Sequence, residues 1–461
     1  MRQTSESFER GAGKGAVIAL VVIVLIILFS VYKLTRNPAP TIKPAEAVAG
    51  IGLNSAVRFI VHDASHRITR VTVEVGQNGK WYEAPVTGKA VPAARNAKNA
   101  GYTVEASAQV GRRAVPQLTP GRAEIRVTAL NDSWGRFFRG GLAVLSLSVP
   151  VRFMPPQIEV LTSQHYINLG GCDMIVFNVS PGTTKSGVQV GKYFFASFPV
   201  TDSKPLTRIA LFAFPYDVDP NTPASIVADD DAGNQTVASF TYKVFPVKWH
   251  ESTIPVDDAY MQRVVPPILS QTTAVQDTGN LVKNYVEINH DLRIIDKRRL
   301  VQFGKQTNPH FMWSQPFLRL PNTKLEANFA DFRTYVYKGQ AIDHEVHLGY
   351  DLASVEHSPV EAANDGQVLY AGWFDIFGNA VIIDHGCGLQ TLYGHMASFK
   401  VKPGELVKRG QVIGTSDSTG LAGGDHVHFG VYLDGIPVVP KEWWDPHWIH
   451  DRITAKLHQF Q

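Results

Sequence analysis

The sequence has very few cysteines and almost no net charge. Only Cys172 and Cys387 occur among 461 residues, which excludes both a disulfide framework and a thiolate zinc site. The 44 Lys and Arg against 41 Asp and Glu leave a net charge of +3, too small for a protein whose main partner is a nucleic acid. Any metal must therefore use histidine and carboxylate ligands, and we expect two free, buried thiols.

Several common catalytic motifs are also absent. The chain has no His-Glu-x-x-His pair, no Gly-x-Ser-x-Gly elbow and no phosphate-binding glycine loop ending in Lys-Ser/Thr. The usual zinc-helix, serine-hydrolase and nucleotide-binding interpretations therefore lack support. Hydrophobic residues make up 44% and charged residues 18% of the chain, a composition that favours folded domains over disorder. At roughly 150 residues per domain, the length predicts about three domains.

One long uncharged run lies near the N-terminus. Residues 16–32 read AVIALVVIVLIILFSVY, about 25 Å of helix, which is near the lower limit for crossing a bilayer. We expect a transmembrane helix over 15–33, preceded by a cytoplasmic tail over 1–14 and followed by a Pro-rich linker over 34–45. The alternative is a cleaved signal peptide, but the apolar run is longer than usual for one. Basic residues on both sides leave the orientation open.

Most of the following chain consists of short runs that alternate apolar and polar residues. Val71, Val73 and Val75, for example, are separated by polar residues, a pattern typical of half-buried antiparallel strands. Such runs recur with turn residues between them. The sequence therefore predicts a mainly β protein with two immunoglobulin-like β-sandwich modules, over 46–153 and 154–250.

The pattern changes after the second predicted sandwich. Asp257 and Asn280 are candidate N-caps of two helices, the second of which ends near Gly304. We therefore expect a short helical connector over 251–320. Two interpretations stay open at this point: the connector packs on its neighbours, or it covers a site in the C-terminal region until it is moved.

Histidines gather in short motifs of the C-terminal third. The residues that stand out are His347 and Asp351 in His-Leu-Gly-Tyr-Asp, His395 in Leu-Tyr-Gly-His, and His426 and His428 in His-Val-His. Residues two apart in a strand face the same side, so His426 and His428 are expected to face one cavity. A catalytic zinc ion needs three nitrogen or oxygen ligands and an open position for water.

Taken together, these motifs resemble those of the lysostaphin- and LytM-type zinc metallopeptidases, which cut peptidoglycan cross-links. The resemblance runs from about residue 329 to 445 and keeps the family's motif order. The residues around these motifs resemble those of a membrane-anchored Gram-negative branch of the family. The resemblance implies a C-terminal LytM-type β-sheet peptidase domain, which we place over 321–446, followed by a C-terminal tail over 447–461.

The same resemblance implies a role for each motif residue. It assigns one zinc ion to His347, Asp351 and His428, and it makes His395 and His426 the catalytic pair beside the bound water. One histidine of the pair would take a proton from the water and help to hold the negative charge that develops on the scissile carbonyl. The division of these roles between the two stays open.

Other features of the C-terminal half have simpler interpretations. Gly430 stands where many relatives carry Glu, and Asp425 where many carry Pro, which bears on substrate preference rather than on zinc. The run from 401 to 414 also resembles the hairpins of lipoyl and biotinyl carrier domains, but no Met-Lys-Met motif, which carries the modified lysine in those domains, occurs there.

The histidines interpreted as surface or supporting residues are His62, His66, His344 and His357. The aromatic residues expected to anchor the tail on the β-core are Trp443, Trp444, Trp448 and Phe460.

These inferences predict a single-pass protein of the cell inner membrane with its C-terminal domains in the periplasm. The expected activity is zinc-dependent hydrolysis of stem-peptide cross-links in peptidoglycan, as a D,D-endopeptidase. Expected partners are peptidoglycan and the inner membrane but no nucleic acid, and a divisome or envelope protein is a candidate. The alternatives are a wall-binding activator of an amidase and an envelope or division scaffold with little activity of its own.

Overall fold

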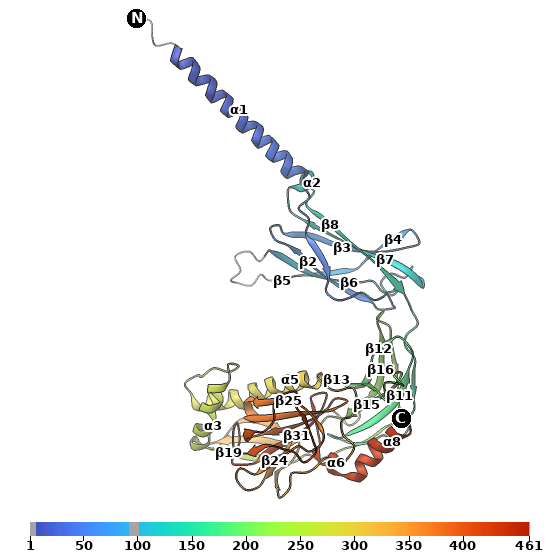
Figure 1. Ribbon diagram of the computed structural model, residues 1–461, viewed down its shortest axis with the longest axis vertical. Helices are drawn as coiled ribbons and strands as arrows, with labels where there is room; N and C mark the ends of the chain where they lie inside the picture. Colours follow the sequence, from blue (N-terminus) through green and yellow to red (C-terminus); the bar gives the residue numbers. More distant parts are fainter. Residues whose placement is uncertain (1–5, 92–100, 461) are drawn as a thin grey trace. The chain divides into compact units, whose positions relative to one another are not determined.

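The computed structural model describes residues 6–91 and 101–460, and the chain forms two compact units (Figure 1). The first unit comprises Met1–Pro155 with Asp230–Gln235, and the second comprises Pro156–Asp229 with Thr236–Gln461. Strands far outnumber helices among the elements of both units. The mainly β fold class is therefore confirmed, whereas the finer domain boundaries stay predictions.

The first unit begins with a long helix, α1 (Glu6–Thr35). Its segment Val17–Thr35 has a mean hydropathy of 2.9 and is not buried inside the protein. Within the described residues, this is the one helix long and apolar enough to cross a membrane. The apolar N-terminal helix that the sequence predicts is present.

Two four-stranded antiparallel sheets form the rest of the first unit, in the orders β1-β2-β6-β5 and β4-β3-β7-β8. Their elements are β1 (Thr41–Pro44), β2 (Ala56–Asp63), β3 (Ile68–Gln77), β4 (Lys80–Ala84), β5 (Val86–Val91), β6 (Tyr102–Gln109), β7 (Gly121–Asn131), α2 (Gly135–Phe138) and β8 (Leu142–Val151). Every second residue of β7 is buried, so the sequence alternation arises from one face of the sheet packing on the core. Phe59 and Val75 lie fully buried in that core.

The first part of the second unit also has two four-stranded sheets, in the orders β14-β15-β11-β9 and β13-β12-β16-β17. The strands are β9 (Ile158–Val160), β10 (Tyr166–Asn168), β11 (Cys172–Val179), β12 (Thr183–Val190), β13 (Tyr193–Ala196), β14 (Phe198–Pro199), β15 (Thr207–Ala213), β16 (Ala224–Asp230), β17 (Gln235–Ala238) and β18 (Lys243–Phe245). Seven of the eight residues of β11 are buried, because this strand is covered on both faces.

The connector contains one strand and a run of helices. They are β19 (Glu251–Val256), α3 (Asp258–Gln271), α4 (Leu281–Glu287), the π-helical turn η1 (Ile288–Leu292) and α5 (Arg293–Gly304). Asp257 caps α3 by accepting a hydrogen bond from the Tyr260 N–H at 2.7 Å, and Asn280 caps α4 by accepting from the Lys283 N–H at 3.0 Å. Both predicted caps are confirmed. Strand β19 pairs in parallel with β21 of the C-terminal region, so the connector is part of that fold.

The C-terminal region is built on an eight-stranded sheet in the order β20-β23-β31-β27-β26-β25-β29, with β32 paired to β31. Its strands are β20 (Lys324–Ala327), β21 (Asp331–Tyr337), β22 (Gln340–His347), β23 (Tyr350–Ala353), β24 (Pro359–Glu361), β25 (Gly366–Trp373), β26 (Asn379–Gly386), β27 (Leu389–Gly394), β28 (Met396–Phe399), β29 (Leu406–Val407), β30 (Val412–Ser416), β31 (Val427–Leu433) and β32 (Ile436–Val438). The helical segments are η2 (Asp375–Phe377), α6 (Pro440–Trp444), α7 (Pro446–Ile449), η3 (His450–Thr454) and α8 (Ala455–His458).

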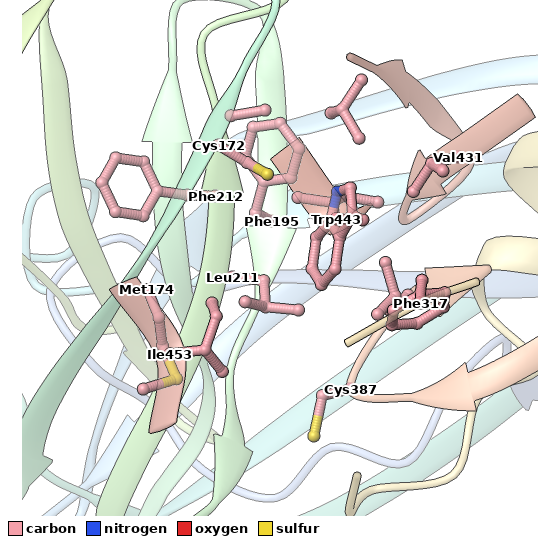
Figure 2. Close-up of a cluster of buried hydrophobic side chains, with 14 of the residues drawn as sticks. Cys172, Met174, Phe195, Leu211, Phe212, Phe317, Cys387, Val431, Trp443 and Ile453 are labelled. Atoms are coloured by element: carbon pink, nitrogen blue, oxygen red, sulfur yellow. The ribbon is translucent and has the colours of Figure 1, made fainter. Parts of the chain in front are cut away.

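One hydrophobic core joins the two parts of the second unit (Figure 2). The Trp443 indole is fully buried and packs edge-on against Phe317, with ring centroids 5.5 Å apart. Figure 2 shows Cys172, Phe195 and Leu211 of the sheets around this indole. Trp444, Trp448 and Phe460 pack against the same core, as the sequence predicts, and Cys172 and Cys387 are free and buried.

Candidate metal centre and active site

Three of the predicted site residues come from three strands, two of the large sheet and one of the three-stranded sheet β19-β21-β22. His347 ends β22, Asp351 lies in β23, and His428 lies in β31. Strands β23 and β31 are antiparallel neighbours in which Asp351 is paired directly with His428. The register of the sheet therefore brings together residues that are 77 positions apart in the chain.

The ligand atoms of these three residues form a compact triangle. His347 Nε2 lies 2.9 Å from Asp351 Oδ1 and 3.0 Å from His428 Nδ1, and the third side, from His428 Nδ1 to Asp351 Oδ1, measures 3.1 Å. A tetrahedral zinc ion with bonds of about 2.0–2.2 Å separates its ligand atoms by about 3.3 Å. The triangle is thus close to one face of such a tetrahedron.

The remaining ring nitrogens show which atoms are free to bind a metal. His347 Nδ1 lies 2.9 Å from the Asn328 carbonyl oxygen, so Nδ1 carries the proton and Nε2 keeps its lone pair. His428 Nε2 is buried and has no hydrogen-bond partner among the described residues, whereas its Nδ1 points into the triangle. Two imidazole lone pairs and one carboxylate oxygen therefore converge, and this donor set fits zinc.

His395 and His426 lie beside the triangle, with ring centroids 4.7 Å apart. His395 Nδ1 donates to the Thr419 carbonyl oxygen at 2.6 Å, and His426 Nδ1 donates to the Gly424 carbonyl oxygen at 2.8 Å. Each ring is thereby fixed with Nε2 as its free atom. His426 Nε2 lies 3.5 Å from Asp351 Oδ1, so the pair adjoins the candidate metal ligands.

Backbone hydrogen bonds join the loops that carry this pair. The Asp417 N–H donates to the His395 carbonyl oxygen at 2.8 Å, and the His426 N–H donates to the Asp417 carbonyl oxygen at 3.1 Å. His395 itself has a positive φ of 60°, a conformation that is uncommon for a residue with a Cβ atom. The strained backbone and the two bonds fix where the imidazoles point.

Burial and charge act in opposite directions on the ionisable groups of the site. Burial alone would raise the pKa of Asp351, but its contacts with His347, His426 and His428 hold that pKa well below its usual value. Burial lowers the pKa of His395 well below its usual value. The structure thus combines an ionised carboxylate with a neutral, buried imidazole.

A cavity of about 690 Å³ adjoins all five residues. The connector contributes a wall of this cavity through Tyr260, Arg263, Tyr285, Asn289 and Arg293. Arg263 Nη2 donates to the Gly423 carbonyl oxygen at 3.0 Å and to the Ala422 carbonyl oxygen at 3.3 Å. Helix α3 therefore also braces the loop that leads into His426.

Sequence reasoning assigned no role to Arg333, which the structure places beside Asp351 in the wall of the same cavity. Its Nε donates to Asp331 Oδ2 at 2.9 Å, and its Nη2 lies 3.6 Å from Asp351 Oδ2. The side chain is 18% exposed. Residues two apart in a strand face the same side, so Arg333 is on the same face of β21 as Asp331. Asp331 is paired with the candidate ligand His347.

The other histidines lie outside the triangle. His344 is exposed on β22 and contacts Thr334 Oγ1 at 3.1 Å. The backbone N–H of His357 donates to Asp425 Oδ2 at 2.8 Å. Asp425, which departs from the family pattern, thus fixes a loop beside the site.

Comparison with known proteins identifies the region that carries the triangle. Residues 345–440 match the family model of peptidase family M23. This segment is an M23 peptidase domain. The match confirms the resemblance to lysostaphin- and LytM-type enzymes that the motifs indicate.

Curated relatives match part of this chain. The DD-carboxypeptidase/endopeptidase Mpg of Neisseria meningitidis is 40% identical over 95 residues, which are 21% of this chain and 22% of that protein. The peptidoglycan DD-endopeptidase ShyC of Vibrio cholerae is 35% identical over 127 residues, 27% of this chain and 29% of that protein. The chain thus spans less than a third of the length of either relative.

A solved structure, a putative peptidase M23 from Pseudomonas aeruginosa, is also similar. It is 19% identical, with a TM-score of 0.35, and the match covers 60% of this chain and 94% of that one.

Proposed function

We propose that the protein is a zinc-dependent peptidoglycan hydrolase that cleaves stem-peptide cross-links, as a D,D-endopeptidase. The observation that carries this proposal is the triangle of His347, Asp351 and His428 with two further imidazoles beside it, all facing one cavity. The names of the relatives that match the M23 domain support the choice of peptidoglycan as substrate.

In this proposal the zinc ligands are His347 Nε2, Asp351 Oδ1 and His428 Nδ1. A bound zinc ion would lower the pKa of a coordinated water and polarise the scissile carbonyl. Arg333 holds the second oxygen of Asp351 and so keeps the first oxygen turned toward the other two ligands.

We divide the roles of the catalytic pair by their hydrogen bonds. His395 donates from Nδ1 to Thr419, so its unprotonated Nε2 takes a proton from the attacking water. His426 lies against the Asp351 carboxylate, which favours a proton on its Nε2. The His426 Nε2 N–H would donate a hydrogen bond to the oxygen on which negative charge develops, and the proton taken up by His395 would pass to the leaving amine nitrogen.

Helix α1 supports a single-pass anchor in the cell inner membrane. The substrate then requires the M23 domain to be in the periplasm, and the two β-regions would be spacers or docking modules between the membrane and the wall. The activator and scaffold alternatives do not require an intact catalytic set, so the presence of all five residues favours the enzyme.

The test is digestion of purified sacculi by the full chain in detergent, with and without a zinc chelator. We expect release of uncross-linked muropeptides from the zinc-loaded protein, loss of zinc and activity in His428→Ala, and zinc retention with a rate about 10²–10⁴-fold lower in His395→Ala. His344→Ala, on the same strand as His347, is the control and should keep both properties. Equal activity of the His428→Ala protein would overturn the proposal.

A further inference from the structure

The loop between β7 and β8 exposes three large aromatic side chains on a short tip. Trp134 is 70% exposed, Phe137 67% and Phe138 70%. Aromatic side chains of this size are normally buried, and a contiguous exposed group of them marks a contact surface. We call residues 134–139 the aromatic tip.

The backbone of the tip is strained in a way that presents these side chains outward. Arg136, Phe137 and Phe138 all have left-handed φ values, of 52°, 55° and 65°. Consecutive left-handed residues with Cβ atoms are costly, because each side chain crowds its own carbonyl. A conformation of this kind persists where the surrounding structure imposes it, and it is a reason to look for a function.

The tip is fastened to the end of the apolar helix α1. The Arg136 N–H donates to the Arg36 carbonyl oxygen at 3.0 Å, one residue beyond the last helical residue, Thr35. Asn131, at the end of β7, donates from Nδ2 to the Pro38 carbonyl oxygen at 2.6 Å. The aromatic tip therefore lies at the level where α1 would leave a membrane (Figure 1).

A second pair of bonds fastens the opposite side of the same loop. The Leu142 N–H donates to Asn37 Oδ1 at 2.8 Å, and Asn37 Nδ2 donates to the Leu142 carbonyl oxygen at 3.1 Å. Both ends of the loop are thus held on the segment that follows α1. The distance between the tip and the end of the helix is fixed by the fold of the first unit.

The charges around the tip match a lipid headgroup layer. Arg136 and Arg139 lie within it, the last turn of α1 adds Lys33, and Arg36 follows directly after the helix. Lys33 lies over the Phe29 ring at 5.5 Å. The nearest carboxylate in the sequence, Asp132, already accepts a hydrogen bond from the Arg67 N–H at 2.9 Å. Aromatic rings interleaved with arginine and lysine are the composition of membrane–water interfaces.

From this arrangement we propose that the aromatic tip inserts into the headgroup–acyl boundary of the bilayer that α1 spans, with its arginines on anionic phospholipid headgroups. The inference rests on the membrane anchorage put forward above. It adds a second membrane contact, which fixes the height and tilt of the first β-sandwich over the bilayer. Without this contact, only the short segment after α1 would connect the first β-sandwich to the membrane.

The experiment places spin labels on the full chain in nanodiscs of phosphatidylethanolamine and phosphatidylglycerol. Phe137→Cys and Phe138→Cys each report on the tip, and Leu25→Cys reports on α1. Lys80→Cys reports on an exposed position at the start of β4, which is paired with the last residue of β3. Because Cys172 and Cys387 are buried, the parent chain gives the background labelling. Accessibility to oxygen and to a water-soluble nickel complex is then measured at each label.

We expect the labels at the tip to lie between those at Leu25 and Lys80, with oxygen access relative to nickel at least about threefold higher than at Lys80. If both tip labels are as accessible to nickel as Lys80 while Leu25 is embedded, the tip contacts water or a protein partner and the inference fails, although the anchor stands. If Leu25 is also in water, the anchor and the inference both fail. Two tip positions are used so that one misfolded variant does not decide the result.

Discussion

The backbone of Gly349 lies directly against the imidazole of His428. A Cβ atom added at Gly349 would lie 2.4 Å from His428 Nε2. Gly349 lies between His347 and Asp351, so the three candidate ligands converge only because the chain has no side chain at this point. The glycine at the third position of the His-Leu-Gly-Tyr-Asp motif is thus required on steric grounds in this fold.

Gly349→Ala is therefore expected to displace His428 and weaken zinc binding by at least about tenfold. The measurement is competition with a chromophoric chelator. The matched control is Gly423→Ala in the loop before His426, because an added Cβ there meets nothing within 4 Å. Equal zinc affinity of the two variants would contradict the steric argument.

Arg333 links the candidate ligand Asp351 to the neighbouring carboxylate of Asp331. Its planar guanidinium contacts both groups through different nitrogens, which a lysine ammonium cannot reproduce. Arg333→Lys is expected to lower zinc affinity about 10–100-fold while the protein stays folded. Arg319→Lys, whose parent side chain donates to the Thr323 carbonyl oxygen, is the control. Unchanged affinity in Arg333→Lys would show that Asp351 needs no such support.

The sequence predicted the parts of this site that depend on local pattern. The His-x-His spacing predicted that His426 and His428 face one cavity, and the caps Asp257 and Asn280 marked where α3 and α4 begin. These features depend on period-2 alternation and on side chains that bond to N–H groups two or three residues away.

Long-range pairing could not be predicted in the same way. The register that places Asp351 opposite His428 depends on sheet packing. The bond from His395 to Thr419 and the contact of Arg333 with Asp351 depend on how loops from different strands meet. Sequence spacing carries no signal for either contact, so the ligand set was found through family resemblance rather than through geometry.

Glu442 makes a buried polar contact between α6 and β11. Its Oε2 accepts a hydrogen bond from the Cys172 N–H at 3.1 Å, and burial raises its pKa from the ordinary 4.5 to about 7. Between these two values the folded protein binds a proton that the unfolded chain has released. The free energy of unfolding therefore falls as pH rises from 4.5 to 7, by about 3 kcal/mol from this group alone.

Glu442→Gln keeps an accepting oxygen but does not ionise. We expect its free energy of unfolding, measured by denaturant titration at pH 5 and pH 7.5, to fall less with pH than that of the parent protein. The control is Glu356→Gln, because Glu356 is exposed. An identical pH dependence of the parent and Glu442→Gln proteins would mean that Glu442 is ionised in the folded state as readily as in the unfolded state.

Trp443, in α6 directly after the M23 domain, is the largest fully buried side chain in the shared core of the second unit (Figure 2). Trp443→Ala leaves a cavity between this domain and the sheets that contain β11, so it should cost about 3–5 kcal/mol of unfolding free energy. Trp134→Ala, which removes an exposed indole, should change it by less than about 0.5 kcal/mol.

The Trp443→Ala variant also tests whether the two parts of the second unit unfold together. Because one core is shared, hydrogen exchange should accelerate in Trp443→Ala both in β11 and in β31, by similar factors. Faster exchange in β31 with unchanged exchange in β11 would mean that the sheets before the connector are stable without the M23 domain. If exchange accelerates in both strands, the sheets before the connector help to stabilise the M23 fold. Deleting these sheets would then abolish activity although every residue of the candidate site is kept.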